Sequence, residues 1–134
     1  MIKFLFVLTF LSAFNMILSK AQKTHDTVEI SAKIIMTREG DIMTLKGTAT
    51  NKSKVFYELN YLLMVIKQGS EGNANNNKQQ GKFVINPDET KTLSEISINM
   101  KSSDQLKAYL FVRDENKNLL ISKDSLEINV EKKK

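Results

Sequence analysis

Residues 55–68 read VFYELNYLLMVIKQ, and this stretch decides the fold. Side chains at alternate positions form one continuous apolar face, made of Tyr57, Leu59, Tyr61, Leu63 and Val65. The opposite face starts polar and then becomes apolar at Leu62, Met64 and Ile66. A period of two residues predicts a β-strand. A strand that is apolar on both faces is either central and covered, or it exposes a patch that a partner binds.

The same alternation outside this stretch predicts six more strands, over residues 28–36, 42–50, 82–86, 91–100, 106–113 and 119–130. Gly40 can supply a positive φ in the first turn. Leu93 is out of phase with Ile96 and Ile98, which predicts either a β-bulge or a strand that starts on the other face. The last strand is expected to be interrupted near Asp124. Seven strands in about 105 residues, with no amphipathic helix, are typical of an immunoglobulin-like antiparallel β-sandwich.

Residues 1–21 have the three parts of a secretory signal peptide: Lys3, an apolar stretch, and a cleavage site at Ser19-Lys20-Ala21. We therefore expect a mature chain from Gln22 to Lys134, forming one domain with a flexible N-terminus and a basic C-terminal tail. About 15 apolar residues with polar interruptions are too short for a stable membrane anchor, which needs about 20. The expected location is the periplasm or the extracellular space.

Composition excludes several classes of function. The 134 residues include no cysteine, no tryptophan and one histidine, so disulfides, thiol chemistry and Cys-ligated metal are excluded. Removal of Lys3 and Lys20, and of no acid, lowers 20 basic residues to 18 against 15 acidic ones, so the mature net charge is +3. Three of those charges lie in the terminal run 132–134, and no aromatic residues interleave with basic ones. A nucleic-acid partner is therefore not expected.

No catalytic residue, metal ligand or cofactor is predicted. His25 lies just after the cleavage site, in a loose terminus, and there is no second histidine to act as a base. The run Asp114-x-Asn116-x-Asn118 matches the first ligand positions of a calcium loop. Leu119 stands where that loop needs glycine and Ser125 where it needs glutamate, so a polar hairpin turn is the better interpretation.

Residues 69–81 are predicted to form a long polar loop. They contain three glycines and six Asn or Gln residues, which favour turns and hydrogen bonding. The loop is either a plain surface connection or a binding loop, since loops longer than about 12 residues are often functional. Gly69, Gly72 and Gly81 are expected to shape it.

One family shares these features in the same order. The run 61–73, YLLMVIKQGSEGN, is followed by Gln80-Gly81-Lys82-Phe83 and by Glu89-Thr90-Lys91-Thr92-Leu93. It resembles the curli assembly chaperones of the CsgH type over about residues 55–100, although the loop here is longer and richer in asparagine. The resemblance implies a small periplasmic immunoglobulin-like protein that binds the curli-type amyloid subunit, keeps it soluble and suppresses its premature assembly. It carries over no catalytic residues.

The client is expected to bind around the third and fourth strands by β-augmentation, with the chain itself a monomer. The residues expected to contact it are Lys67, Asn73, Gln80 and Phe83, although Phe83 could equally pack in the core. Two other classes stay open. The chain could be a minor structural or adhesive component of an extracellular fibre. It could also be a carbohydrate-binding sandwich that uses Tyr109 and Phe111.

Overall fold

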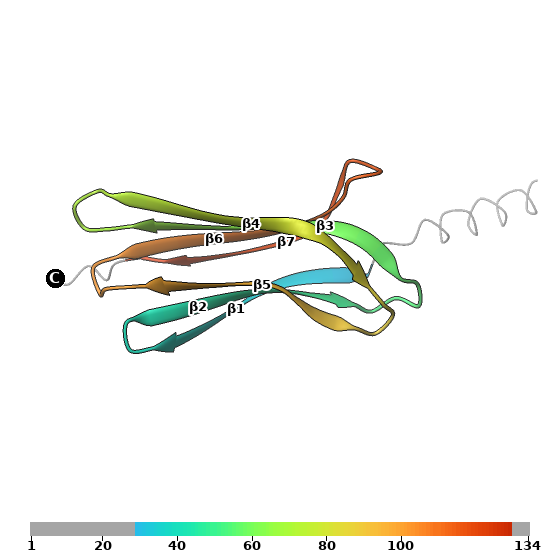
Figure 1. The fold of residues 1–134 in the computed structure, drawn as a ribbon, viewed down its shortest axis with the longest axis horizontal. Helices are drawn as coiled ribbons and strands as arrows, with labels where there is room; N and C mark the ends of the chain where they lie inside the picture. Colours follow the sequence, from blue (N-terminus) through green and yellow to red (C-terminus); the bar gives the residue numbers. More distant parts are fainter. Residues whose placement is uncertain (1–28, 130–134) are drawn as a thin grey trace, which may run out of the picture.

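Two antiparallel sheets form the fold of residues 29–129, the part of the chain that the computed structural model describes. The first sheet has the order β1-β2-β5 and the second has the order β4-β3-β6-β7. Figure 1 shows the two sheets as stacked layers. The strands are β1 (Ile30–Glu39), β2 (Ile42–Asn51), β3 (Tyr57–Gln68), β4 (Ala74–Ile85), β5 (Thr90–Asn99), β6 (Gln105–Asp114) and β7 (Leu119–Ile128). The predicted seven-stranded sandwich is confirmed; the expected signal peptide and terminal tail lie outside the described residues.

The core lies between the sheets and is made by one face of each central strand. Alternate residues of β6 are fully buried, and so are Leu59, Leu63 and Val65 of β3. They meet Met43, Leu45 and Ala49 of β2 from the opposite sheet. No disulfide supports this packing, so apolar burial at about 25 cal/mol per Å² is the main stabilising contribution.

The predicted bulge at Leu93 is confirmed. Ser94 pairs with Gly47 and Thr92 pairs with Thr48, so Leu93 is the extra residue on β5. The bulge returns Leu93 to the interior, where it packs against both groups of buried side chains. A similar shift on β7 leaves Ile121 unpaired, between Leu120 and Ser122.

Two predictions about strand limits are wrong. β7 continues through Asp124, because its irregularity lies at Ile121 instead. The fourth strand begins at Ala74 and not near Lys82, so most of the expected loop is strand. β4 pairs with β3 along its whole length, from Gln68 opposite Ala74 to Tyr57 opposite Ile85. The backbone of the asparagine-rich segment is held by that pairing.

Side chains bridge the two sheets along both sides of the sandwich. On one side the backbone N–H of Ala32 donates to Ser122 Oγ at 2.9 Å, and that of Ile34 donates to Asp124 Oδ2 at 2.8 Å. On the other side Lys91 Nζ donates to the carbonyl oxygen of Val84 at 2.7 Å. Side chains of β7 thus bond the backbone of β1, whereas a side chain of β5 bonds the backbone of β4 near the β4–β5 turn.

Candidate binding surface

The outer face of the four-stranded sheet carries an apolar strip, called here the outer patch. It consists of Leu62, Met64 and Ile66 on β3 with Tyr109 and Phe111 on β6, all of them half-buried. Met64 pairs with Tyr109 and Leu62 with Phe111, and the two aromatic rings stack with centroids 6.3 Å apart. No other element among residues 29–129 covers this face (Figure 1). β3 is therefore central within its sheet and also exposes a patch.

Basic residues border the outer patch. Lys78 on β4 pairs with Met64, and Lys107 on β6 pairs with Ile66. Lys123 on β7 pairs with Phe111. All three lysines are exposed. An extended chain lying across this face would therefore meet an apolar centre with lysines at its border.

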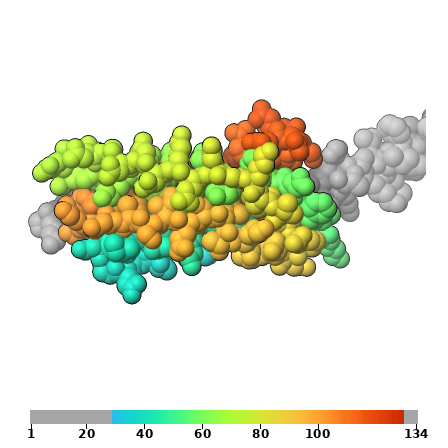
Figure 2. Space-filling view, in the orientation of Figure 1, coloured from blue at the N-terminus to red at the C-terminus, as the bar shows by residue number. Residues whose placement is uncertain are grey.

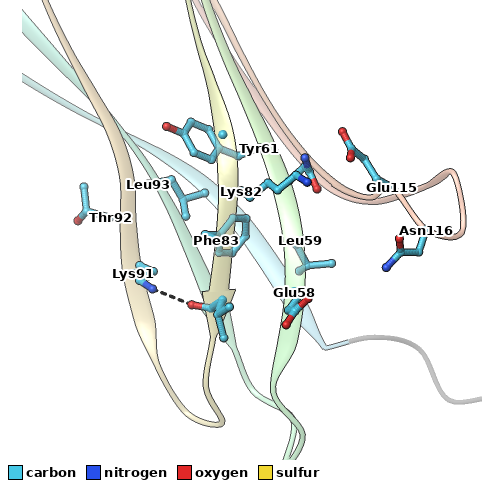
Figure 3. A pocket seen from close by; sticks show the side chains of 13 residues that line it. Glu58, Leu59, Tyr61, Lys82, Phe83, Lys91, Thr92, Leu93, Glu115 and Asn116 are labelled. Atoms are coloured by element: carbon cyan, nitrogen blue, oxygen red, sulfur yellow. Dashed lines mark hydrogen bonds between the residues drawn. The ribbon is translucent and has the colours of Figure 1, made fainter.

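The turn between β6 and β7 stands above the same face and creates a hollow beside β4. Two adjoining spaces of about 670 and 630 Å³ lie there, and both are lined by Asn60, Tyr61, Gly81, Lys82 and Glu115. Figure 3 shows Glu115 and Asn116 of the turn on one side of this region, with Lys82 extending toward them. Figure 2 shows the turn, in red, rising next to the side chains of β4. An extended partner on this side of the molecule would run past this turn.

Gly81 lies within β4, and not in a loop as expected, and it lines the hollow. It pairs with Tyr61, and a Cβ atom at Gly81 would lie 3.2 Å from Tyr61 Cε1. The absence of a side chain lets the tyrosine ring lie against the backbone of the edge strand. The predicted loop-shaping role is therefore wrong for Gly81, because this residue is in a strand.

The other two glycines lie at the tip of the β3–β4 hairpin, as expected. Gly72 has φ +88°, a conformation that favours glycine, and its N–H donates to the carbonyl oxygen of Gly69 at 3.0 Å. The N–H of Gly69 donates to the carbonyl oxygen of Asn73 at 2.8 Å. These bonds close the turn that leads into β4.

The four residues expected to bind the client do not share a face. Lys67 has the inward orientation of Leu63 and Val65, and its Nζ donates to the carbonyl oxygen of Asn99 at 3.1 Å. Phe83 is only 9% exposed and packs in the core, with its ring centroid 6.2 Å from that of Tyr61. Asn73 is exposed at the hairpin tip, and Gln80 is exposed on β4 opposite Leu62. A partner can reach Asn73 and Gln80 directly.

Within residues 29–129 the acidic side chains form no group of three that could hold a metal ion. The polar run that partly matches a calcium loop is a hairpin turn. Asp114 Oδ1 accepts the N–H groups of Asn116 and Lys117 at 3.1 and 3.3 Å, so the carboxylate serves the turn itself. His25 lies outside the described residues. In the described part of the chain no helix is long and apolar enough to cross a membrane.

The geometry defines a class of protein: an immunoglobulin-like sandwich with an uncovered sheet face and a polar edge strand. No family model matches the sequence, and no curated protein matches it. Among solved structures, the chain is similar to CsgH of R. palustris, with 22% identity and a TM-score of 0.56, over 73% of this chain and 91% of that one. It is also similar to the E. coli curli protein CsgC, with 19% identity and a TM-score of 0.60, over 72% of this chain and 96% of that one.

These two matches confirm the resemblance to the CsgH type at the level of the fold. A third similarity, to a β-glucuronidase of Bacteroides uniformis, has 8% identity and a TM-score of 0.54. It covers 76% of this chain and only 14% of that enzyme. The enzyme match is therefore to one sandwich domain within a much longer chain.

Proposed function

We propose that this chain is a periplasmic chaperone that binds curli-type amyloid subunits and prevents their premature assembly into fibres. The observation that carries the proposal is the fold match to CsgH and CsgC over nearly the full length of both proteins. The sequence resemblance over residues 55–100 supports the same assignment. Export through residues 1–21 belongs to this proposal, because the resemblance to the CsgH type implies a periplasmic protein.

The arrangement of strands suits this task. Amyloid subunits grow by pairing strand to strand, so a protein that restrains them needs an exposed edge or face for an extended chain. It must also not extend the fibre itself. In this sandwich β1 is closed by side chains of β7, while β4 and the adjoining outer patch remain accessible. One side of the molecule can therefore bind an extended chain, while on the other side the N–H groups of Ala32 and Ile34 already have partners.

Of the four residues first expected to contact the subunit, two are kept as direct contacts and two are given a role in the fold. Gln80 and Asn73 are proposed as direct contacts because both are exposed. Lys67 and Phe83 contribute through the fold, since one binds a carbonyl of the opposite sheet and the other fills the core. Replacement of Gln80 and Asn73 should therefore weaken binding without loss of stability.

Sedimentation of a purified curli-type subunit, with and without the mature chain, tests the proposal. We expect the subunit to stay in the supernatant for longer and this chain to remain in the supernatant with it. An unrelated immunoglobulin-like domain of similar size and charge is the control. If this chain pellets with the fibres at a fixed ratio, it is a fibre component. If the subunit pellets as fast as with the control domain, the proposed function is wrong.

A further inference from the structure

The free side of β4 identifies the backbone groups through which the proposed function can act. β4 is the first strand of its sheet, so it pairs with β3 on one side only. Residues 74–80 are all exposed, and they contain Asn75, Asn76, Asn77, Gln79 and Gln80. In Figure 2 the side chains of this strand project along the upper margin of the molecule. An edge of this length is a ready template for another strand.

The hydrogen bond from Lys91 shows which backbone groups face outward. It reaches the carbonyl oxygen of Val84, so that carbonyl points away from β3. In an antiparallel pair the N–H and C=O of one residue point to the same side, and the side alternates along the strand. The register between β3 and β4 contains no shift. The residues that share this outward orientation are therefore Lys82, Gln80, Lys78 and Asn76.

The outward carbonyl of Val84 already accepts a hydrogen bond from Lys91, whereas the outward backbone groups of the other four residues have no such partner within residues 29–129. Among the hydrogen bonds that join residues 29–129 outside the strand ladders, none uses their backbone groups. Gln79 faces the other way, and its Oε1 accepts the hydroxyl of Ser94 on β5. The bridge to the second sheet therefore leaves the outward backbone of the neighbouring residues open. On β1, by contrast, Ser122 and Asp124 fill the equivalent positions.

The residues of this edge limit what can bind there. The antiparallel register that overlaps residues 76–84 of two copies would place Lys78 opposite Lys82 twice, and like charges directly opposite each other are destabilising. A second copy of this chain is thus a poor occupant. An extended segment with Asn, Gln, Ser or Thr opposite the amides, and no basic residue opposite the two lysines, meets no such repulsion. Paired amide side chains would add hydrogen bonds along the strands.

We propose that a polar, amide-rich segment of the amyloid subunit docks on β4 as an added strand, bonding the outward backbone of Asn76, Lys78, Gln80 and Lys82. This inference rests on the proposed function and specifies the edge through which it acts.

A proline substitution at one outward position tests whether the edge of β4 binds the added strand. Gln80→Pro removes an N–H that points away from β3, so the ladder with β3 keeps its bonds. Gln80→Thr keeps the N–H and changes only the side chain, and it is the matched control. We expect Gln80→Pro to bind a synthetic Asn/Gln/Ser-rich repeat peptide of a curli-type subunit about tenfold more weakly than Gln80→Thr, as loss of one hydrogen bond predicts. Equal affinity of the two variants would overturn the proposal.

Amide hydrogen exchange on the wild-type protein gives an answer even if Gln80→Pro fails to fold. Addition of the same peptide should slow exchange at Asn76, Lys78, Gln80 and Lys82. Protection confined to β1 or β7 would overturn the proposal. So would protection of these four amides that rises with protein concentration in the absence of peptide, because a second copy would then occupy the edge. If the wild-type chain restrains the subunit while both Gln80 variants act alike, the edge assignment fails and the proposed function stands.

Discussion

Asn51 holds together the turns at one end of the sandwich. Its side chain is 0% exposed. Nδ2 donates to the carbonyl oxygen of Val55 at 2.7 Å, and Oδ1 accepts the N–H and the hydroxyl of Ser53 at 2.9 and 2.7 Å. Its backbone N–H donates to the carbonyl oxygen of Glu89 at 2.9 Å. One buried residue therefore joins two turns: its side chain bonds the link between β2 and β3, and its backbone bonds the turn between β4 and β5.

Replacement of this amide should destabilise the fold. We predict that Asn51→Ala lowers the free energy of unfolding by about 2–3 kcal/mol, because the substitution empties a fully buried site and removes the hydrogen bonds of the amide to Val55 and Ser53. Urea denaturation followed by circular dichroism measures the change. Asn99→Ala is the control, since that side chain is exposed on β5, and it should shift the free energy of unfolding by less than about 0.5 kcal/mol. Equal effects of the two substitutions would show that the Asn51 network adds nothing.

The orientation of single residues was partly predictable. Lys67 lies two and four residues after Val65 and Leu63, so the period of two already placed it on the inward face. Phe83 belonged to a predicted strand of only five residues, 82–86, which is too short for its alternation to identify the buried face. The packing of Phe83 between Leu59, Ile85 and Tyr61 resolves what the short pattern could not.

At the scale of elements, the protection of β1 depends on two side chains of β7. Ser122 and Asp124 accept the outward N–H groups of Ala32 and Ile34. We predict that the double variant Ser122→Ala/Asp124→Ala speeds amide exchange at both residues by about five- to tenfold, the effect of losing a bond worth about 1–1.4 kcal/mol. Exchange at Leu63, on a strand paired at both sides, should not change.

The control for this prediction is Ser125→Ala, since Ser125 lies on the outer face of β7 and is exposed. It should leave exchange at β1 as in the wild type. Unchanged exchange in the double variant would mean that β7 does not protect this edge. Self-association of the double variant, but not of the control, would support the account further, because an uncapped edge can pair with another chain.

Strands with one buried face were predicted well, and the polar edge strand was not. The alternation in β2 and β6 is visible because burial on one side requires apolar residues at every second position. Residues 75–80 are polar on both faces, so no pattern marks them as strand. Their structure comes from pairing with β3, whose apolar stretch extends to Ile66 and needs a partner along its whole length. Tertiary pairing therefore outweighs the low strand propensity of asparagine.

For the whole molecule, the sequence predicts the sandwich but not the assignment of strands to sheets. Alternation reports which residues are buried, whereas strand order depends on contacts between distant segments. The identity of β4 as an edge strand, and hence the outward backbone of Gln80, becomes visible only from the order β4-β3-β6-β7. The outer patch was foreseen as one of two alternatives, because β3 is apolar on both faces.

The central claim is that the folded chain delays amyloid formation by a curli-type subunit. A thioflavin fluorescence time course of that subunit, with increasing amounts of the mature chain, tests it most directly. We predict that the lag time lengthens with dose, that Gln80→Thr lengthens it somewhat less than the wild type because only a side-chain contact is lost, and that Gln80→Pro lengthens it much less than Gln80→Thr. A lag time that stays the same at an equimolar amount of folded wild-type chain would contradict the claim.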